Sequence, residues 1–256
     1  MRLIRTLILT AGLAAVAVGG QAQTSAEAAK TALEPGAVAA LDRMGSYLRS
    51  LPAFQVTAAT TTEDVLDDGQ KAQYASTTDL VATRTPDRLR AQVSSGSHER
   101  LYLYDGKDFT LFAKRLGFFA TAAAPGTLGE LADRLEDRYG IEIPIVDLFK
   151  WGPSASAGLT GAIDLGPSEA GGVTCQHYAF RQEGLDWQVW IQLGDYPLPR
   201  RLVATTTTDE ARPQFTATYD WNLAPSFSAS AFTFEPPPDA KRIVFAADRV
   251  PGGAAR

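Results

Sequence analysis

The apolar positions after residue 34 first follow a helical period. They recur at spacings of three and four residues: Leu41, Met44, Leu48 and Leu51. This spacing gives a helix one apolar face. Pro35 suits a first helical turn, and Pro52 disfavours a helical residue before it. The pattern predicts a helix from Pro35 to about Leu51.

From Phe54 onward the period changes to two residues. Apolar and polar positions alternate, and threonine, which favours an extended chain, is frequent. Asp67-Asp68-Gly69 and Asp105-Gly106-Lys107 are turn sequences between such runs. A β-meander is therefore expected over these runs: 54–62, 73–84, 89–93, 101–104 and 109–112.

A helical stretch interrupts the strands after the meander. Thr127 and Glu130 form a capping-box pattern, in which each side chain bonds the backbone N–H of the other. Leucines at 128, 131 and 135 share one face, and Gly140 suits the end of the helix. The pattern predicts a helix between Thr127 and Gly140.

The second half of the chain is expected to return to strands. Pro144 suits the start of a second short helix through Phe149. Residues 152–172 are rich in Gly, Ser and Ala, which indicates a surface loop. Further strands are expected at these runs: 173–180, 187–192, 202–208, 215–221, 232–234 and, at an edge, 242–245.

The counted runs amount to about ten strands with few helices. The economical architecture is mainly β (α+β), with one strongly curved or part-closed antiparallel sheet and helices on one side. A single domain is expected over residues 35–246. A flexible lead-in at 23–34 and a disordered tail at 247–256 are expected to flank it.

The first 22 residues resemble a secretory signal peptide. Arg2 and Arg5 precede an apolar run from Leu7 to Val18, and the small residues Gly20 and Ala22 stand at the −3 and −1 positions of the expected cut after Ala22. The run is too short for a stable membrane span. No cysteine follows the cut, so no lipoprotein acylation site is expected. These features predict an exported, soluble protein without a lipid anchor or transmembrane segment.

The net charge and the cysteine content limit the kinds of partner and of covalent bond that the chain can have. The formal net charge is −5, and no basic stripe with interleaved aromatics is present, which argues against nucleic acid. Cys175 is the only cysteine, so an intramolecular disulfide cannot form. It is expected to be a small buried side chain, with intermolecular pairing as the alternative.

No residue pattern indicates catalysis or metal binding. Cys175 and His177 could be a fragment of a metal or nucleophile site, but such a site needs further partners. The chain has only one other histidine, His98. The acidic hairpin at Glu63, Asp67 and Asp68 lacks the spacing of a calcium loop. Phosphate loops, nucleophile elbows and His-Glu-x-x-His motifs are also missing. We therefore expect no catalytic residue, no cofactor, no metal and no enzymatic activity.

The apolar side chains are the stronger functional candidates. A curved sheet under helices either fills its interior or leaves a cavity, and the sequence leaves both open. A cavity would accept an acyl chain, because each buried methylene contributes about 0.8 kcal/mol. The candidates for such a site are Leu101, Leu103, Phe109, Leu111, Phe118, Phe119, Leu128, Leu131, Leu135, Ile145, Leu148, Phe149, Trp151, Trp187, Val189 and Ile191.

Several segments, in their order and spacing, resemble the LolA/LolB-like superfamily, which includes the periplasmic carrier of outer-membrane lipoproteins. They are Arg84–Arg90, Tyr104–Lys107, Asp137–Phe149, Trp190–Arg201 and Phe232–Pro237. The chain is even more similar to a group of uncharacterised predicted periplasmic proteins of that superfamily. The resemblance implies a periplasmic location. It also implies an incomplete β-barrel whose apolar interior, covered by helices, receives lipid or acylated protein.

The resemblance also implies an arginine that holds the helical lid. Arg84 is the nearest equivalent, but Thr85 stands between it and Pro86, and Arg88 or Arg90 could take its place. Two functions follow as hypotheses. The first is a soluble periplasmic carrier or binding protein for a lipid, acyl chain or lipoprotein. The alternative is a cell-envelope interaction module with a filled core, which binds a protein partner at a strand edge.

Overall fold

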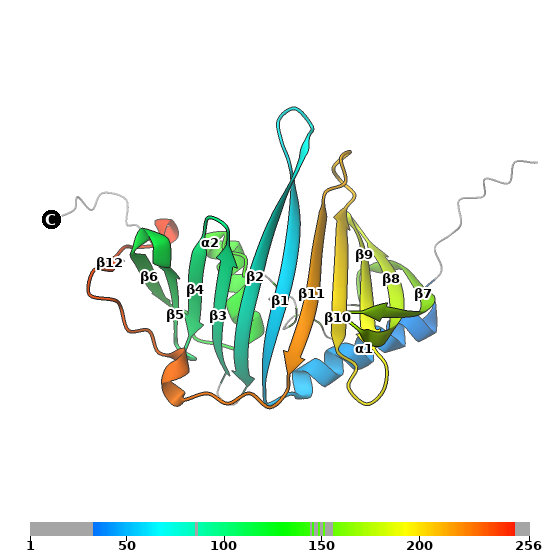
Figure 1. The fold of residues 1–256 in the computed structure, drawn as a ribbon, viewed down its shortest axis with the longest axis horizontal. Coiled ribbons are helices and arrows are strands. Elements are labelled where there is room, and N and C mark those ends of the chain that lie inside the picture. Colours follow the sequence, from blue (N-terminus) through cyan, green and yellow to red (C-terminus); the bar gives the residue numbers. More distant parts are fainter. Residues whose placement is uncertain are drawn as a thin grey trace, which may run out of the picture. The chain divides into compact units, whose positions relative to one another are not determined.

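Twelve strands of the described chain form one large, curved, unclosed sheet (Figure 1). The computed structural model describes residues 33–248, except 85, 86, 144, 146, 147, 149, 150 and 152–155. The predicted signal peptide and most of the predicted lead-in, tail and second short helix lie outside the described residues. The sheet order is β12-β6-β5-β4-β3-β2-β1-β11-β10-β9-β8-β7.

The strands are β1 (Ala53–Val65), β2 (Lys71–Arg84), β3 (Asp87–Ser95), β4 (Glu99–Tyr104), β5 (Asp108–Ala113), β6 (Phe118–Ala123), β7 (Leu159–Ala170), β8 (Val173–Gln182), β9 (Leu185–Gln192), β10 (Pro199–Thr206), β11 (Gln214–Asn222) and β12 (Lys241–Arg242). The α-helices are α1 (Pro35–Ser50) and α2 (Leu128–Tyr139). Short 3-10 helices are η1 (Lys114–Leu116), η3 (Ala229–Phe232) and η4 (Ala246–Asp248).

Both predicted long helices are confirmed. Pro35 stands in the first turn of α1, whose buried face includes Leu41, Met44 and Leu48. At α2 both capping-box bonds are present. The Thr127 N–H donates to Glu130 Oε2 at 2.7 Å, and the Glu130 N–H donates to Thr127 Oγ1 at 3.3 Å. Gly140 ends α2 with a φ of 60°, a left-handed conformation that glycine adopts without steric cost.

The sheet departs from the expectation in three places. Residues 152–172 are not one loop, because β7 occupies most of that stretch. As an edge strand, β7 tolerates Pro167 and glycines, and its register with β8 shifts at Gly161 and Gly166. The strand expected at 232–234 does not form, because Phe232 ends η3 and the next two residues belong to no strand. The short β12 runs parallel to β6, so the sheet is mixed rather than purely antiparallel.

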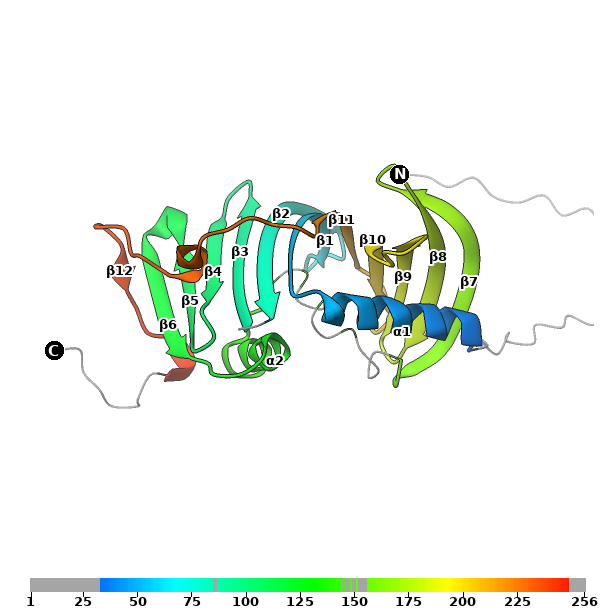
Figure 2. The same cartoon turned by 90° about the horizontal axis from the view of Figure 1, so that it is seen from below.

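The topology explains why one face of the sheet is covered. Strand β6 lies near one edge and β7 forms the other, so the chain between them must cross the sheet. It carries α2 on the way. Both α1 and α2 lie on the same face, which we call the inner face (Figure 2). The segment after β11, including η3, runs along the opposite, outer face (Figure 2).

Candidate apolar binding site

The inner face carries the main hydrophobic core, and most of the apolar candidates lie there. Leu111 is partly buried and packs against this cluster. The candidates within the cluster are Phe109, Leu128, Leu131, Leu135, Ile145, Leu148, Trp151, Trp187, Val189 and Ile191. Side chains from both helices, from strands of both halves of the sheet and from the connection after α2 thus meet on one face.

Some candidates lie elsewhere, and the expectation that they line the interior is wrong for them. Leu101 and Leu103 form a separate cluster with Phe112, against which Phe119 packs. Successive strand residues point to opposite faces, so this cluster lies on the outer face. Phe118 alternates to the inner-face side of β6, but it is 38% exposed next to the edge strand β12 and does not belong to the buried core. A further candidate, Phe149, lies outside the described residues.

The error at β4 has a clear cause. The run Leu101-Tyr102-Leu103-Tyr104 carries apolar side chains on both faces of the strand, because both faces are covered. The inner-face positions are Tyr102 and Tyr104, each almost fully buried in the main core. Sequence reasoning chose the leucines on hydrophobicity. The pairing of Tyr104 with the inner-face Phe109 would have identified the correct parity.

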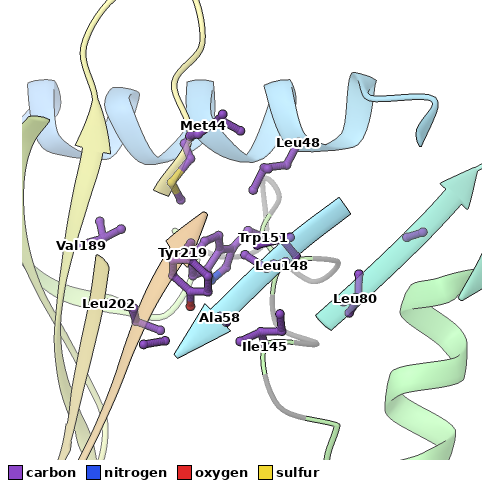
Figure 3. Packing of buried hydrophobic residues seen from close by; sticks show 14 of the residues in the cluster. Met44, Leu48, Ala58, Leu80, Ile145, Leu148, Trp151, Val189, Leu202 and Tyr219 are labelled. Carbon is purple, nitrogen blue, oxygen red and sulfur yellow. The ribbon is translucent and has the colours of Figure 1, made fainter. Parts of the chain in front are cut away.

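The middle of the inner face is covered by isolated side chains rather than by a helix. Ile145, Leu148 and Trp151, from the connection after α2, lie between α1 and the strands (Figure 3). We call these three side chains the plug. The strand residues Ala58 and Tyr219 belong to the same cluster. Sequence reasoning did not select Tyr219, although its alternation with Trp221 placed it on an apolar face.

Helix α1 holds the plug through a backbone contact. Arg49 Nη1 donates a hydrogen bond to the Trp151 carbonyl oxygen at 2.6 Å, and Arg49 Nη2 bonds Ser46 Oγ at 3.1 Å. A Cβ atom at Gly45 would stand 2.8 Å from the same Trp151 oxygen. The close approach of the connection to α1 therefore depends on glycine at this position.

The plug includes a strained residue. Ile145 has a φ of 65°, a left-handed conformation that is unfavourable for a β-branched side chain. Such a conformation costs about 1–3 kcal/mol and persists only where the surroundings enforce it. The Leu148 N–H bonds the Ile145 carbonyl at 3.1 Å, and both side chains are buried. Release of the plug would relieve this strain.

The N-terminus of α2 is attached to the end of the β2–β3 hairpin and to β4. Tyr104 Oη donates to the Gly126 carbonyl at 2.5 Å. The Asp87 carboxylate accepts a hydrogen bond from the Leu128 backbone. Burial raises the pKa of Asp87, and the nearby Arg84 charge opposes that shift. These contacts fix the start of α2 over the inner face.

The three lid-holding candidates do not share a face. Arg84 pairs with Asp87 in the β2–β3 register, and this pair continues the inner-face positions of the two strands. Burial lowers the pKa of Arg84. Arg88 and Arg90 alternate to the outer face, where Arg90 pairs with Leu103. Of the three arginines, only Arg84 is therefore placed on the face that the helices cover. Its role in holding them stays a prediction.

The cysteine and histidine of β8 form a structural cluster on the outer face. Cys175 is buried and has a free thiol, as predicted. The His177 ring stacks on Trp190 with 3.8 Å between ring centres, and its Nε2 lies 3.0 Å from Gln188 Oε1. Burial lowers the pKa of His177. Within the described ranges, no group of three or more His, Cys, Asp or Glu side chains is arranged to hold a metal ion.

No helix in the described part of the chain is both long and apolar enough to cross a bilayer. The sequence has no significant match among curated proteins.

Several solved structures are similar to the chain. Lipoprotein LppX of Mycobacterium tuberculosis is 11% identical, with a TM-score of 0.48, and 75% of this chain and 98% of that chain are covered. LprF of Mycobacterium bovis is 14% identical with a TM-score of 0.45, covering 82% and 99%. A LolA superfamily protein of Nitrosomonas europaea is 12% identical with a TM-score of 0.31, covering 77% and 97%.

One family model matches residues 37–246, which include most of α1, all of α2, the twelve strands of the described chain and the plug. The chain therefore belongs to the family described as "Predicted periplasmic protein (DUF2092)", in agreement with the sequence-based assignment to uncharacterised periplasmic proteins.

Proposed function

We propose that the protein is a non-enzymatic periplasmic carrier or binding protein for a long acyl chain of a lipid or lipoprotein. The acyl chain lies against the inner face, in the position that the plug occupies in the structure. The helices α1 and α2 remain in place and form the sides of the site. The ligand thus replaces the chain's own apolar cover rather than filling an existing hole.

The observation that carries this proposal is the nature of the cover. The middle of the inner face is closed by the plug, which is tied to α1 through the Arg49 bond to Trp151 and contains the strained Ile145. For these side chains to leave, this hydrogen bond and their apolar contacts within the core must break. The strained backbone at Ile145 also makes the closed state less stable than an ordinary core.

A comparison of burial energies defines the ligand class. Exposing the three plug side chains costs about 1.5–3 kcal/mol each, or about 5–9 kcal/mol together. A chain of about twelve methylenes gains about 10 kcal/mol on burial, whereas one of about six gains only about 5. Long acyl chains therefore displace the plug and short ones do not.

The sheet edges give less support to the alternative of a docked protein strand. Strand β7 carries two register shifts and Pro167, and β12 has only two residues. Irregular and short edges are poor templates for an added strand. We therefore favour the interior over the edges as the binding site.

The test is a competition measurement on the purified protein after removal of bound lipid. A fluorescent long-chain fatty acid should bind saturably, and unlabelled palmitate should displace it far more effectively than hexanoate. Lipid extracted before that step should contain acyl chains by mass spectrometry. Absence of both saturable binding and extracted lipid contradicts the proposal.

Tryptophan fluorescence locates the site. Trp151 belongs to the plug, whereas Trp190 lies on the outer face. In Trp151→Phe the change in fluorescence on adding palmitate should be much smaller, because Trp187 is the only other tryptophan of the described chain that belongs to the buried inner-face cluster. In the matched control Trp190→Phe the change should persist. Persistence in both variants would place the ligand away from the plug.

A further inference from the structure

Two separate segments meet at the β12 edge of the sheet and expose apolar and basic side chains. Residues 114–118 contain η1 and the start of β6, and residues 241–244 contain β12. The Lys241 N–H donates to the Gly117 carbonyl at 2.7 Å, and the Ile243 N–H donates to the Phe119 carbonyl at 2.8 Å. Both ribbon views place β6 and β12 together at one end of the sheet (Figure 1 and Figure 2). We call the surface of these two segments the edge patch.

The apolar part of the edge patch consists of several large exposed side chains. Four large side chains are exposed: Leu116 (69%), Phe118 (38%), Ile243 (47%) and Val244 (55%). Single exposed apolar residues are ordinary, but a group of them marks an interaction surface. The hydrogen bonds between the two segments keep their backbones side by side, because paired strands lie about 4.8 Å apart. Successive residues of β12 point to opposite faces, so the exposed apolar side chains lie on both sides of this edge of the sheet.

The charged part of the edge patch is entirely basic. The two segments read Lys114-Arg115-Leu116-Gly117-Phe118 and Lys241-Arg242-Ile243-Val244, without an acidic residue, in a chain of net charge −5. Lys114 pairs with Glu99 at 2.5 Å. Arg115 donates to the Gly96 carbonyl, an uncharged acceptor, at 2.9 Å, and both basic residues of β12 are exposed.

The nearby acidic residues offset only part of this charge, because the four basic residues of the patch outnumber Glu99 and the exposed Asp239. Asp239 precedes Lys241 by two residues and is exposed. Asp248 comes after β12 in the sequence, and its carboxylate accepts hydrogen bonds from Arg138 at 2.6 Å and Tyr139 at 3.0 Å. The edge patch therefore combines net positive charge with exposed apolar side chains.

We propose that the edge patch docks the protein on the surface of an anionic phospholipid bilayer. The cations of Arg115, Lys241 and Arg242 lie at the lipid phosphates. The four exposed apolar side chains enter the interfacial region. Charge complementarity carries the choice of partner, because this edge is basic in a chain whose net charge is −5 and is therefore attracted to an anionic surface. The same balance orients the molecule with β12 toward the membrane.

The test is flotation of the purified protein with vesicles, without added fatty acid. Vesicles of phosphatidylethanolamine and phosphatidylglycerol should bind the protein, and vesicles of phosphatidylcholine should bind it far less. Each membrane-facing cation contributes about five-fold to partitioning, so Lys241→Glu with Arg242→Glu should weaken binding by at least about 25-fold. Raising the salt concentration should also weaken it. The pair Ile243→Ser and Val244→Ser should weaken binding by about ten-fold.

Matched controls stand at other exposed sites. Lys107→Glu, in the turn between β4 and β5, changes a charge away from the patch, and Leu66→Ser, in the β1–β2 turn, removes an exposed apolar side chain. Both should bind vesicles like the wild type, and circular dichroism should show all variants folded. Three results would overturn the proposal: no flotation of the wild type with anionic vesicles, equal binding to phosphatidylcholine, or a dimer that the Ile243 and Val244 changes dissociate. Since no fatty acid is present, these results are independent of acyl-chain binding.

Discussion

Arg49 on α1 donates its 2.6 Å hydrogen bond to the backbone carbonyl of Trp151, 102 residues further along the chain. The acceptor is a main-chain atom, so the contact depends on where the connection runs rather than on which side chain it carries. One long-range contact thus couples the first helix to the cover of the inner face.

Removal of this contact should loosen the plug. Arg49→Ala eliminates a charged donor to a part-buried carbonyl, which should lower the unfolding free energy by about 1.5–3 kcal/mol. Urea denaturation measures the change, and hydrogen exchange should increase in peptides that contain Leu148 and Trp151. Arg43→Ala, an exposed position on the same helix, is the control and should leave both quantities unchanged. Equal exchange in both variants would contradict the role of Arg49.

Gly45→Ala should destabilise the protein, against the usual trend. Alanine in a helix interior is normally favoured over glycine by about 1 kcal/mol. Here the new Cβ would lie 2.8 Å from the Trp151 oxygen, so the connection must shift. At Gly129 in α2 the nearest atom is 4.0 Å away, and Gly129→Ala should stabilise the protein. Thermal melting of both variants tests this prediction. A higher melting temperature for Gly45→Ala would contradict the close approach of the connection to α1.

The capping box of α2 should contribute measurably to stability. Thr127→Ala removes the acceptor for the Glu130 N–H and should cost about 1 kcal/mol. Glu130→Ala removes the reciprocal bond, and a double-mutant cycle should show coupling between the two positions. Hydrogen bonds from the Thr127 backbone and side chain lower the pKa of Glu130, so its contribution is present above pH 4.5 and disappears as the pH falls through the lowered value. Additive single changes would argue against a reciprocal cap.

His177 should make stability depend on pH in the mildly acidic range. Burial lowers its pKa below the ordinary 6.5, so the folded state binds its proton less readily than the unfolded state. Its contribution is complete above pH 6.5 and falls as the pH drops toward the lowered value. Urea unfolding between pH 7 and about pH 5 should show this slope in the wild type and in His98→Gln, and a smaller slope in His177→Gln. An unchanged slope in His177→Gln would be inconsistent with a partly buried ring whose pKa is lowered.

Local features of the fold could be predicted because they depend on neighbouring residues. The Pro35 start of α1, the Thr127 capping box and the Gly140 end of α2 each involve a few consecutive positions. The turn at Asp105 is of the same kind, since its carboxylate accepts the Lys107 and Asp108 N–H groups. Such short-range bonds are visible in a single sequence.

Features that depend on distant segments could not be predicted in the same way. The outer-face position of Leu101 and Leu103 follows from the chain after β11, where Phe234 contacts Phe112 and Phe119. The strand identity of residues 159–170 follows from pairing with β8, which compensates for a glycine-rich sequence. The Arg49 contact could not be predicted either, because it depends on where the connection after α2 runs. In each case the deciding partner is remote in sequence.

The pairing of β1 with β11 in the middle of the sheet has a consequence for how the chain folds. Gln55 and Asn222 are register partners although 167 residues separate them. Closing so long a loop is entropically costly, and sheets built on distant pairings form slowly. The strands on either side, β2 to β6 and β7 to β10, pair with near neighbours and can form earlier. The centre of the finished sheet is thus expected to be the last part of it to assemble.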